Sequence, residues 1–178
     1  DVKRAGFSAQ ALKFSGLSAA DLKAIDFSVK ELEAAGFRAN QLRQAGFTGL
    51  DLKGVGFKPG ELRAVGYLAA ELHAAGFTVK ELRDSGYSAT ELKAAEITVA
   101  ELKDSGFAAS ALRSEGFVVN ELKRAFTPVE LKAAGFVATD LYKGGVSVQE
   151  LKALNFSLEG LKADGLTASE LRVGGYTA

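Results

Sequence analysis

Residues 77–86 read FTVKELRDSG, and the two stretches that follow, YSATELKAAE at 87–96 and ITVAELKDSG at 97–106, repeat the same pattern. In each, a large apolar residue stands first, a hydroxyl residue second, Leu sixth and, in most copies, Gly tenth. Extended in both directions, this register gives sixteen repeats of ten residues from Phe7 onward and one repeat of nine, residues 117–125. Because internal repeats define an architecture, we expect residues 1–178 to form a single tandem array without obvious terminal caps.

Two positions of the repeat carry the predicted core. Position six is Leu in all seventeen copies, from Leu12 to Leu171, and position one is aromatic in most copies. Position three is small or β-branched, and the remaining positions are mostly polar. Large apolar residues at two fixed positions of the period predict one buried face in every repeat.

A short helix explains the other positions. Position two is Ser or Thr in eleven copies and position five is Asp or Glu in thirteen, which is the spacing of a capping box, as in Ser28 with Glu31. Both prolines, Pro59 and Pro128, stand at position three, the first helical residue, where a missing amide proton costs nothing. Gly at position ten supplies the left-handed residue that ends a helix. Three copies replace this Gly, with Asp26, Glu96 and Asn155.

These signals predict an all-α solenoid of about seventeen short helices, each ended by Gly. A lone ten-residue helix is shorter than the roughly 12 to 15 residues at which isolated helices become marginally stable, so each repeat must stack on its neighbours. Between Tyr67 and Ala125, position three alternates Ala and Val, which hints at a twenty-residue coil of two helices. The repeat that ends at Ala125 lacks its Gly, and we expect a kink or a shortened helix there.

An alternative fold comes from the spacing of the large apolar residues. They recur every five positions, Phe then Leu, and this spacing resembles that of the pentapeptide-repeat family, whose chains wind into a square β-helix. The resemblance covers the whole chain but only in its period, and it implies a pentapeptide-like β-solenoid. That family needs a small inward-pointing residue two places before each central Leu, where this chain has long polar side chains such as Lys30, Asn40 and Gln149. The helical fold therefore explains more positions.

The composition narrows the classes of function. The chain has 22 basic and 22 acidic residues, no cysteine and a single histidine, His73. We therefore expect no catalytic residues, no metal site and no cofactor. His73 stands at position seven, which is Lys or Arg in most copies, and we interpret it as a variant of an exposed basic column.

The charge pattern bears on partners. Acidic residues at position five and basic residues at position seven form two parallel columns, which we interpret as a solvated surface with modest ion pairing between repeats. The alternative is a recognition face for an oppositely patterned partner. The balanced charge argues against nucleic acid, and the frequent charged residues leave no apolar stretch of about 18 residues for a membrane span. Because the glycines are spaced by ten and form no phosphate-binding cluster, we also expect no small-molecule substrate.

Together these expectations favour a non-catalytic structural or scaffolding protein over an enzyme. The alternative is a protein- or peptide-binding solenoid that uses a groove or a charged face. A binder should gather its exposed non-consensus residues on one face, and here they are scattered: Phe14, Arg38, Lys58, Leu68, Val118, Val137 and Tyr142. The chain also opens and closes inside a repeat, so we expect Val2 and Tyr176 to lie at apolar ends through which copies associate head to tail. The sequence does not decide the compartment.

Overall fold

A computed structural model describes residue 3 and residues 5–176, and within these it contains seventeen helices and no strand. The all-α prediction is confirmed, and the β-solenoid alternative is wrong. The helices are six residues long, except for one of four residues in the nine-residue repeat.

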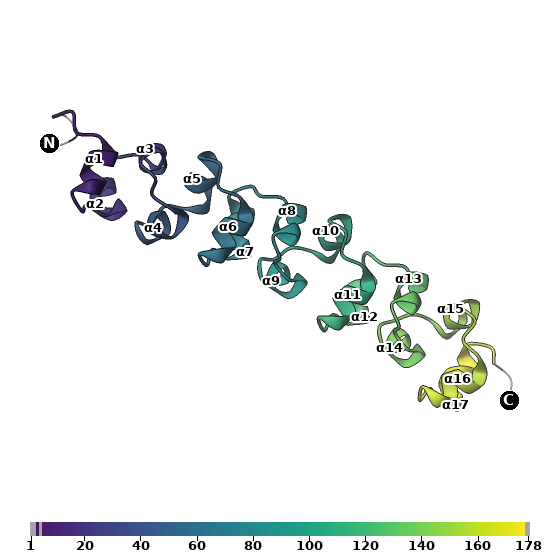
Figure 1. Cartoon of the computed structure of the whole chain (residues 1–178). Helices are drawn as coiled ribbons and strands as arrows, with labels where there is room; N and C mark the ends of the chain where they lie inside the picture. The colour runs from purple at the N-terminus through teal and green to yellow at the C-terminus, as the bar shows by residue number, and fades with distance from the viewer. Residues whose placement is uncertain (1–2, 4, 177–178) are drawn as a thin grey trace. The chain divides into compact units, whose positions relative to one another are not determined.

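Packing groups the helices into two compact units, Asp1–Glu96 and Ile97–Ala178, which are described separately. Figure 1 shows the order of the helices along the chain. The first unit contains α1 (Ala9–Phe14), α2 (Ala19–Ala24), α3 (Val29–Ala34), α4 (Ala39–Gln44), α5 (Gly49–Gly54), α6 (Pro59–Ala64), α7 (Ala69–Ala74), α8 (Val79–Asp84) and α9 (Ala89–Ala94). The second contains α10 (Val99–Asp104), α11 (Ala109–Ser114), α12 (Val119–Leu122), α13 (Pro128–Ala133), α14 (Ala138–Lys143), α15 (Val148–Ala153), α16 (Leu158–Ala163) and α17 (Ala168–Val173).

The helices begin as the sequence predicts. All eleven Ser and Thr residues at position two accept a hydrogen bond from the amide three residues later. In the capping box of α3, the Ser28 amide donates to the Glu31 carboxylate at 2.7 Å. The reverse half of the box is kept even without a hydroxyl residue, since the Leu68 amide donates to Glu71 at 2.7 Å. Both prolines occupy the first turn of their helices.

The helices end in Schellman motifs. At the end of α3 the Phe37 amide donates to the Leu32 carbonyl at 3.0 Å and the Gly36 amide to the Glu33 carbonyl at 2.7 Å. The residue at position ten therefore has a positive φ, which is also found where Gly is replaced: 66° at Asp26, 62° at Glu96 and 58° at Asn155. The predicted role of position ten is confirmed.

The predicted core is also confirmed. Every Leu at position six is buried, and most of these side chains have no exposed surface. The large residues at position one are buried in most repeats, as at Phe37 and Tyr87. Within each unit, most helices therefore contribute one Leu and one flanking large apolar residue to the interior.

Within each unit, a helix packs against the next helix and against the one after it. The first unit has the pairs α1·α3, α2·α4, α5·α7, α6·α8 and α7·α9, and the second has α11·α13, α12·α14, α14·α16 and α15·α17. This arrangement is a solenoid with two helices, or twenty residues, in each coil. The alternation at position three was a correct hint of this period.

The nine-residue repeat contains the shortened helix, as predicted. Helix α12 has four residues, and its C-terminal cap is Lys123. The Phe126 amide donates to the Leu122 carbonyl at 2.9 Å, four residues back instead of the usual five. The chain thus keeps Phe126 and Leu122 in the core by removing helix.

Candidate functional site

The basic residue at position seven reaches across two repeats. Lys13, near the end of α1, donates from Nζ to the carbonyl oxygens of Ala35 at 3.1 Å and Gly36 at 2.7 Å. The same Nζ lies 4.6 Å from the centroid of the Phe37 ring. We call the carbonyl groups at positions nine and ten, together with the position-one ring that follows them, a cation seat.

The contact recurs through both units. Cations lie between 4.3 and 5.3 Å from ring centroids in ten pairs: Lys3–Phe27, Lys13–Phe37, Lys23–Phe47, Arg43–Tyr67, Lys53–Phe77, Arg63–Tyr87, Lys103–Phe126, Arg113–Phe136, Lys132–Phe156 and Lys152–Tyr176. Such distances are within the range of cation–π attraction. In eight of these pairs the cation and the ring are 24 residues apart, and in the two pairs that span the nine-residue repeat, Lys103–Phe126 and Arg113–Phe136, they are 23 residues apart.

The end of a helix is a favourable place for a cation. The last carbonyl groups of a helix carry partial negative charge because the peptide dipoles are aligned. The left-handed residue at position ten turns the chain, and where it is Gly it leaves room for the incoming side chain. A Cβ atom on Gly66 would lie 2.7 Å from the Arg43 guanidinium. Glycine at that repeat therefore both ends a helix and admits the arginine.

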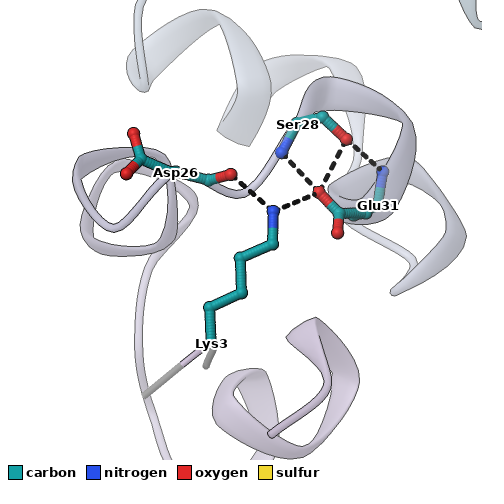
Figure 2. A network of polar contacts seen from close by, with 4 residues as sticks. All are labelled: Lys3, Asp26, Ser28 and Glu31. Atoms are coloured by element: carbon teal, nitrogen blue, oxygen red, sulfur yellow. Dashed lines mark hydrogen bonds and ion pairs between the residues drawn. The ribbon is translucent and has the colours of Figure 1, made fainter. Parts of the chain in front are cut away.

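Three of these cations also pair with a capping carboxylate. Figure 2 shows Lys3, whose Nζ donates to the Asp26 carbonyl at 2.6 Å and to Glu31 at 3.0 Å. Glu31 accepts in turn from the amide and the hydroxyl of Ser28, both at 2.7 Å. The amide and hydroxyl of Ser28, followed by Lys3, lower the pKa of Glu31 to about 2.

Equivalent pairs occur in both units. Lys103 lies 2.8 Å from Glu130 and lowers the pKa of that carboxyl to about 2, together with the amide and hydroxyl of Thr127. Arg63 lies 3.6 Å from Glu91. The predicted ion pairing between repeats is confirmed by these contacts, whereas the carbonyl and ring contacts were not predicted.

Tyrosines at position one add a second link of twenty residues. The Tyr87 hydroxyl donates to the Tyr67 carbonyl at 2.5 Å, the Tyr67 hydroxyl donates to the Phe47 carbonyl, and the Tyr176 hydroxyl donates to the Phe156 carbonyl at 3.0 Å. Burial raises the pKa of Tyr67 and Tyr87. The predicted end residue Tyr176 is thus half-buried and bonded, while Val2 lies outside the described residues.

The single histidine, His73, which we interpreted as a variant of the exposed basic column, is half-buried. Its Nδ1 atom is buried without a hydrogen-bond partner among the described residues. Lys13 and Lys53, at the same position of the repeat, are half-buried as well, so the column is partly covered where we expected it to be exposed. In the described part of the chain, no three His, Cys, Asp or Glu side chains gather in a way that could hold a metal ion.

Hollows in the surface accompany four of the cations. They lie beside Lys3, Lys13, Arg63 and Lys103 and have volumes between about 360 and 500 Å³. Each is lined by the basic residue, the Gly after it, the start of the next repeat and the seated ring. The same concave surface is therefore repeated along the array.

Comparison with known proteins agrees with the register. A family model described as a decapeptide repeat region matches residues 1–67, 56–125 and 125–178, and these matches together span the chain. No curated protein and no solved structure matches it. None of the helices that the structure describes has the length and apolar character needed to cross a membrane.

Proposed function

Since the chain belongs to the decapeptide repeat family, we propose that it is a non-catalytic structural or scaffolding protein. The observation that carries this proposal is the recurring cation seat. The basic side chains that a binding surface would present to a partner are used instead to hold one repeat to another. A contact that recurs between repeats supports an array whose stability comes from stacking.

We further propose that copies associate head to tail. The position-seven side chains reach toward later repeats, as Lys152 does toward Gly175 at 3.4 Å. Lys162 and Arg172 are exposed, and no hydrogen bond or ion pair is seen for their side chains within the described residues. In the first repeat, Phe7 is 54% exposed, whereas Phe27 and Phe37 beneath their cations are 5% and 4% exposed. The exposed Lys162 and Arg172 side chains of one copy therefore complement the uncovered Phe7 ring of another copy.

Light scattering over a concentration series of the full chain tests this association. The apparent mass should rise with concentration, and a Phe7→Ser variant or a Lys162→Ser, Arg172→Ser double variant should suppress the rise. A Leu68→Ser variant is the matched control, because Leu68 is 66% exposed in the middle of the first unit. Strictly monomeric chains at high concentration, or equal suppression by the control, would contradict head-to-tail association.

A second candidate function rests on the repeated hollows. A groove with a basic residue, a ring and small residues at a regular interval suits an extended peptide. Such a module would bind without changing its own state of association. Chains that stay monomeric in the scattering experiment, and that separately bind peptides from a library at the hollow beside Arg63, would favour this second function.

A further inference from the structure

One position-seven residue in the first unit reverses the charge of the column. Glu33, in the last turn of α3, stands where Lys13, Lys23 and Lys53 have an ammonium group. The register places Glu33 opposite the seat formed by the Val55 and Gly56 carbonyls and the Phe57 ring. This seat therefore lacks the internal cation that Lys13, Lys23 and Lys53 supply to the equivalent seats at Phe37, Phe47 and Phe77.

The space above this seat is open. A Cβ atom built on Gly56 would meet no atom within 4 Å, whereas on Gly46 and Gly76 it would lie 3.6 and 3.2 Å from the Nζ atoms of Lys23 and Lys53. Phe57 is only half-buried. By contrast, Phe47 and Tyr67, which lie beneath cations, are 8% and 5% exposed. The Phe57 ring and the Gly56 turn are thus accessible at a seat that has no internal cation.

The acceptors of the seat are also available. Within the described residues, no side chain donates to the Val55 or Gly56 carbonyl, and the Glu33 carboxylate has no hydrogen bond or ion pair. Glu61 occupies the position at which Glu31 and Glu91 pair with a seated cation. In the part of the chain that the structure describes, its carboxylate accepts from the Lys58 amide, at 2.8 Å, and pairs with no cation. The register therefore places two carbonyl groups, a ring face and the Glu61 carboxylate around a position that has no internal cation, and Glu33 adds a second negative charge in the last turn of α3.

We propose that this seat binds the guanidinium or ammonium group of an Arg or Lys side chain from a partner protein. The other seats show how the cation is held: Arg43 lies 5.2 Å from the Tyr67 ring and donates to the Val65 carbonyl at 2.6 Å. A planar guanidinium can stack on a ring and donate at its edge at the same time. Arginine is therefore the preferred ligand.

Two further departures from the repeat pattern lie next to this seat. Arg38 and Lys58 are the basic residues found at position two, where Ser or Thr is usual. Lys58 directly follows Phe57, and Arg38 occupies the position that lines the equivalent hollow beside Lys13. Their positive charges repel each incoming basic residue, and this repulsion grows with the charge of the ligand, so the seat should take a single basic side chain and not a run of them.

The test is an NMR titration of the full-length chain with the blocked tripeptide acetyl-Gly-Arg-Gly-amide. Saturable shifts are expected at the Gly56 amide and the Phe57 ring, with weaker effects at Gly46 and Gly76. The same peptide with citrulline in place of arginine keeps the shape and removes the charge, and it should give no saturable shift. Equal shifts at the occupied seats, or equal effects of the citrulline peptide, would overturn the proposal.

Two variants sharpen the result. Glu33→Lys supplies the internal cation and should abolish the saturable shifts at Gly56. Phe57→Leu keeps an apolar residue in the core and should weaken binding about two- to fivefold, because the ring contact is lost. Unchanged spectra of the α7 and α8 residues show that either variant is folded. Undiminished binding to a folded Glu33→Lys protein would refute the site.

Discussion

The Nζ atom of Lys23 lies 4.3 Å from the centroid of the Phe47 ring and donates to the Gly46 carbonyl at 2.8 Å. One charged atom thereby joins the end of α2 to the turn that precedes α5. The contact ties three features of the sequence together: a basic residue, a glycine and an aromatic residue. A single cation seat therefore joins the charge of Lys23, the turn at Gly46 and the core ring of Phe47.

The central leucines should carry most of the packing energy of a repeat. Leu82 has no exposed surface, so Leu82→Ala is expected to lower the free energy of unfolding by about 2 to 5 kcal/mol through the cavity it leaves. Lys80→Ala, at an exposed position of the same helix, is the control and should change it by less than about 0.5 kcal/mol. Urea unfolding of the three proteins measures the difference. A similar loss of unfolding free energy in both variants would mean that the buried and exposed faces of α8 are wrongly assigned.

Filling the open seat should stabilise the protein. Glu33→Lys places a cation over Phe57 and removes a negative charge from the end of α3, so the free energy of unfolding should rise by about 0.5 to 1 kcal/mol. Asp104→Lys makes the same charge change at an exposed position in the last turn of α10 but not at position seven, and it should stabilise less. If the two substitutions have the same effect in urea unfolding, then the gain comes from net charge alone.

The left-handed residue Glu96 carries backbone strain. Its φ is 62°, a conformation that costs a residue with a Cβ atom about 1 to 2 kcal/mol. Glu96→Gly should therefore raise the melting temperature, with a net gain of about 0.5 to 1 kcal/mol after the added entropy of the unfolded chain. Ala94→Gly, inside α9, should instead cost about 1 kcal/mol. If both variants lost stability, the left-handed backbone at position ten would not explain why Gly usually stands there.

Acid should destabilise the array through its capping carboxylates. The pKa values of Glu31 and Glu130 fall to about 2 from 4.5 on folding, so their contribution is complete above pH 4.5 and is lost as the pH falls toward 2. The same direction holds for six further capping residues, Asp21, Asp51, Glu81, Glu91, Glu150 and Glu170. Stability should be flat from pH 5 to 7 and decrease below. A Glu31→Gln, Glu130→Gln variant should show a shallower decrease, and an unchanged slope would exclude these two carboxylates.

What the sequence predicts, and what it does not, follows from distance along the chain. The capping boxes, the prolines at the first helical residue and the left-handed Asp26 and Asn155 all depend on residues within one repeat, and each was predictable. The seats join residues such as Lys13 and Phe37, whose proximity depends on how many helices form one coil. The period of twenty was only hinted at by the alternation at position three, so the basic column looked like a solvated face.

A cation and a ring twenty-four residues apart stabilise the array together, and a double-mutant cycle on Lys23 and Phe47 tests this coupling. Lys23→Met keeps the apolar stem and removes the charge, and Phe47→Leu keeps an apolar core residue and removes the ring. Urea unfolding of the parent chain, both single variants and the double variant should give a favourable coupling free energy of about 0.5 to 1 kcal/mol. A coupling free energy indistinguishable from zero would contradict the claim.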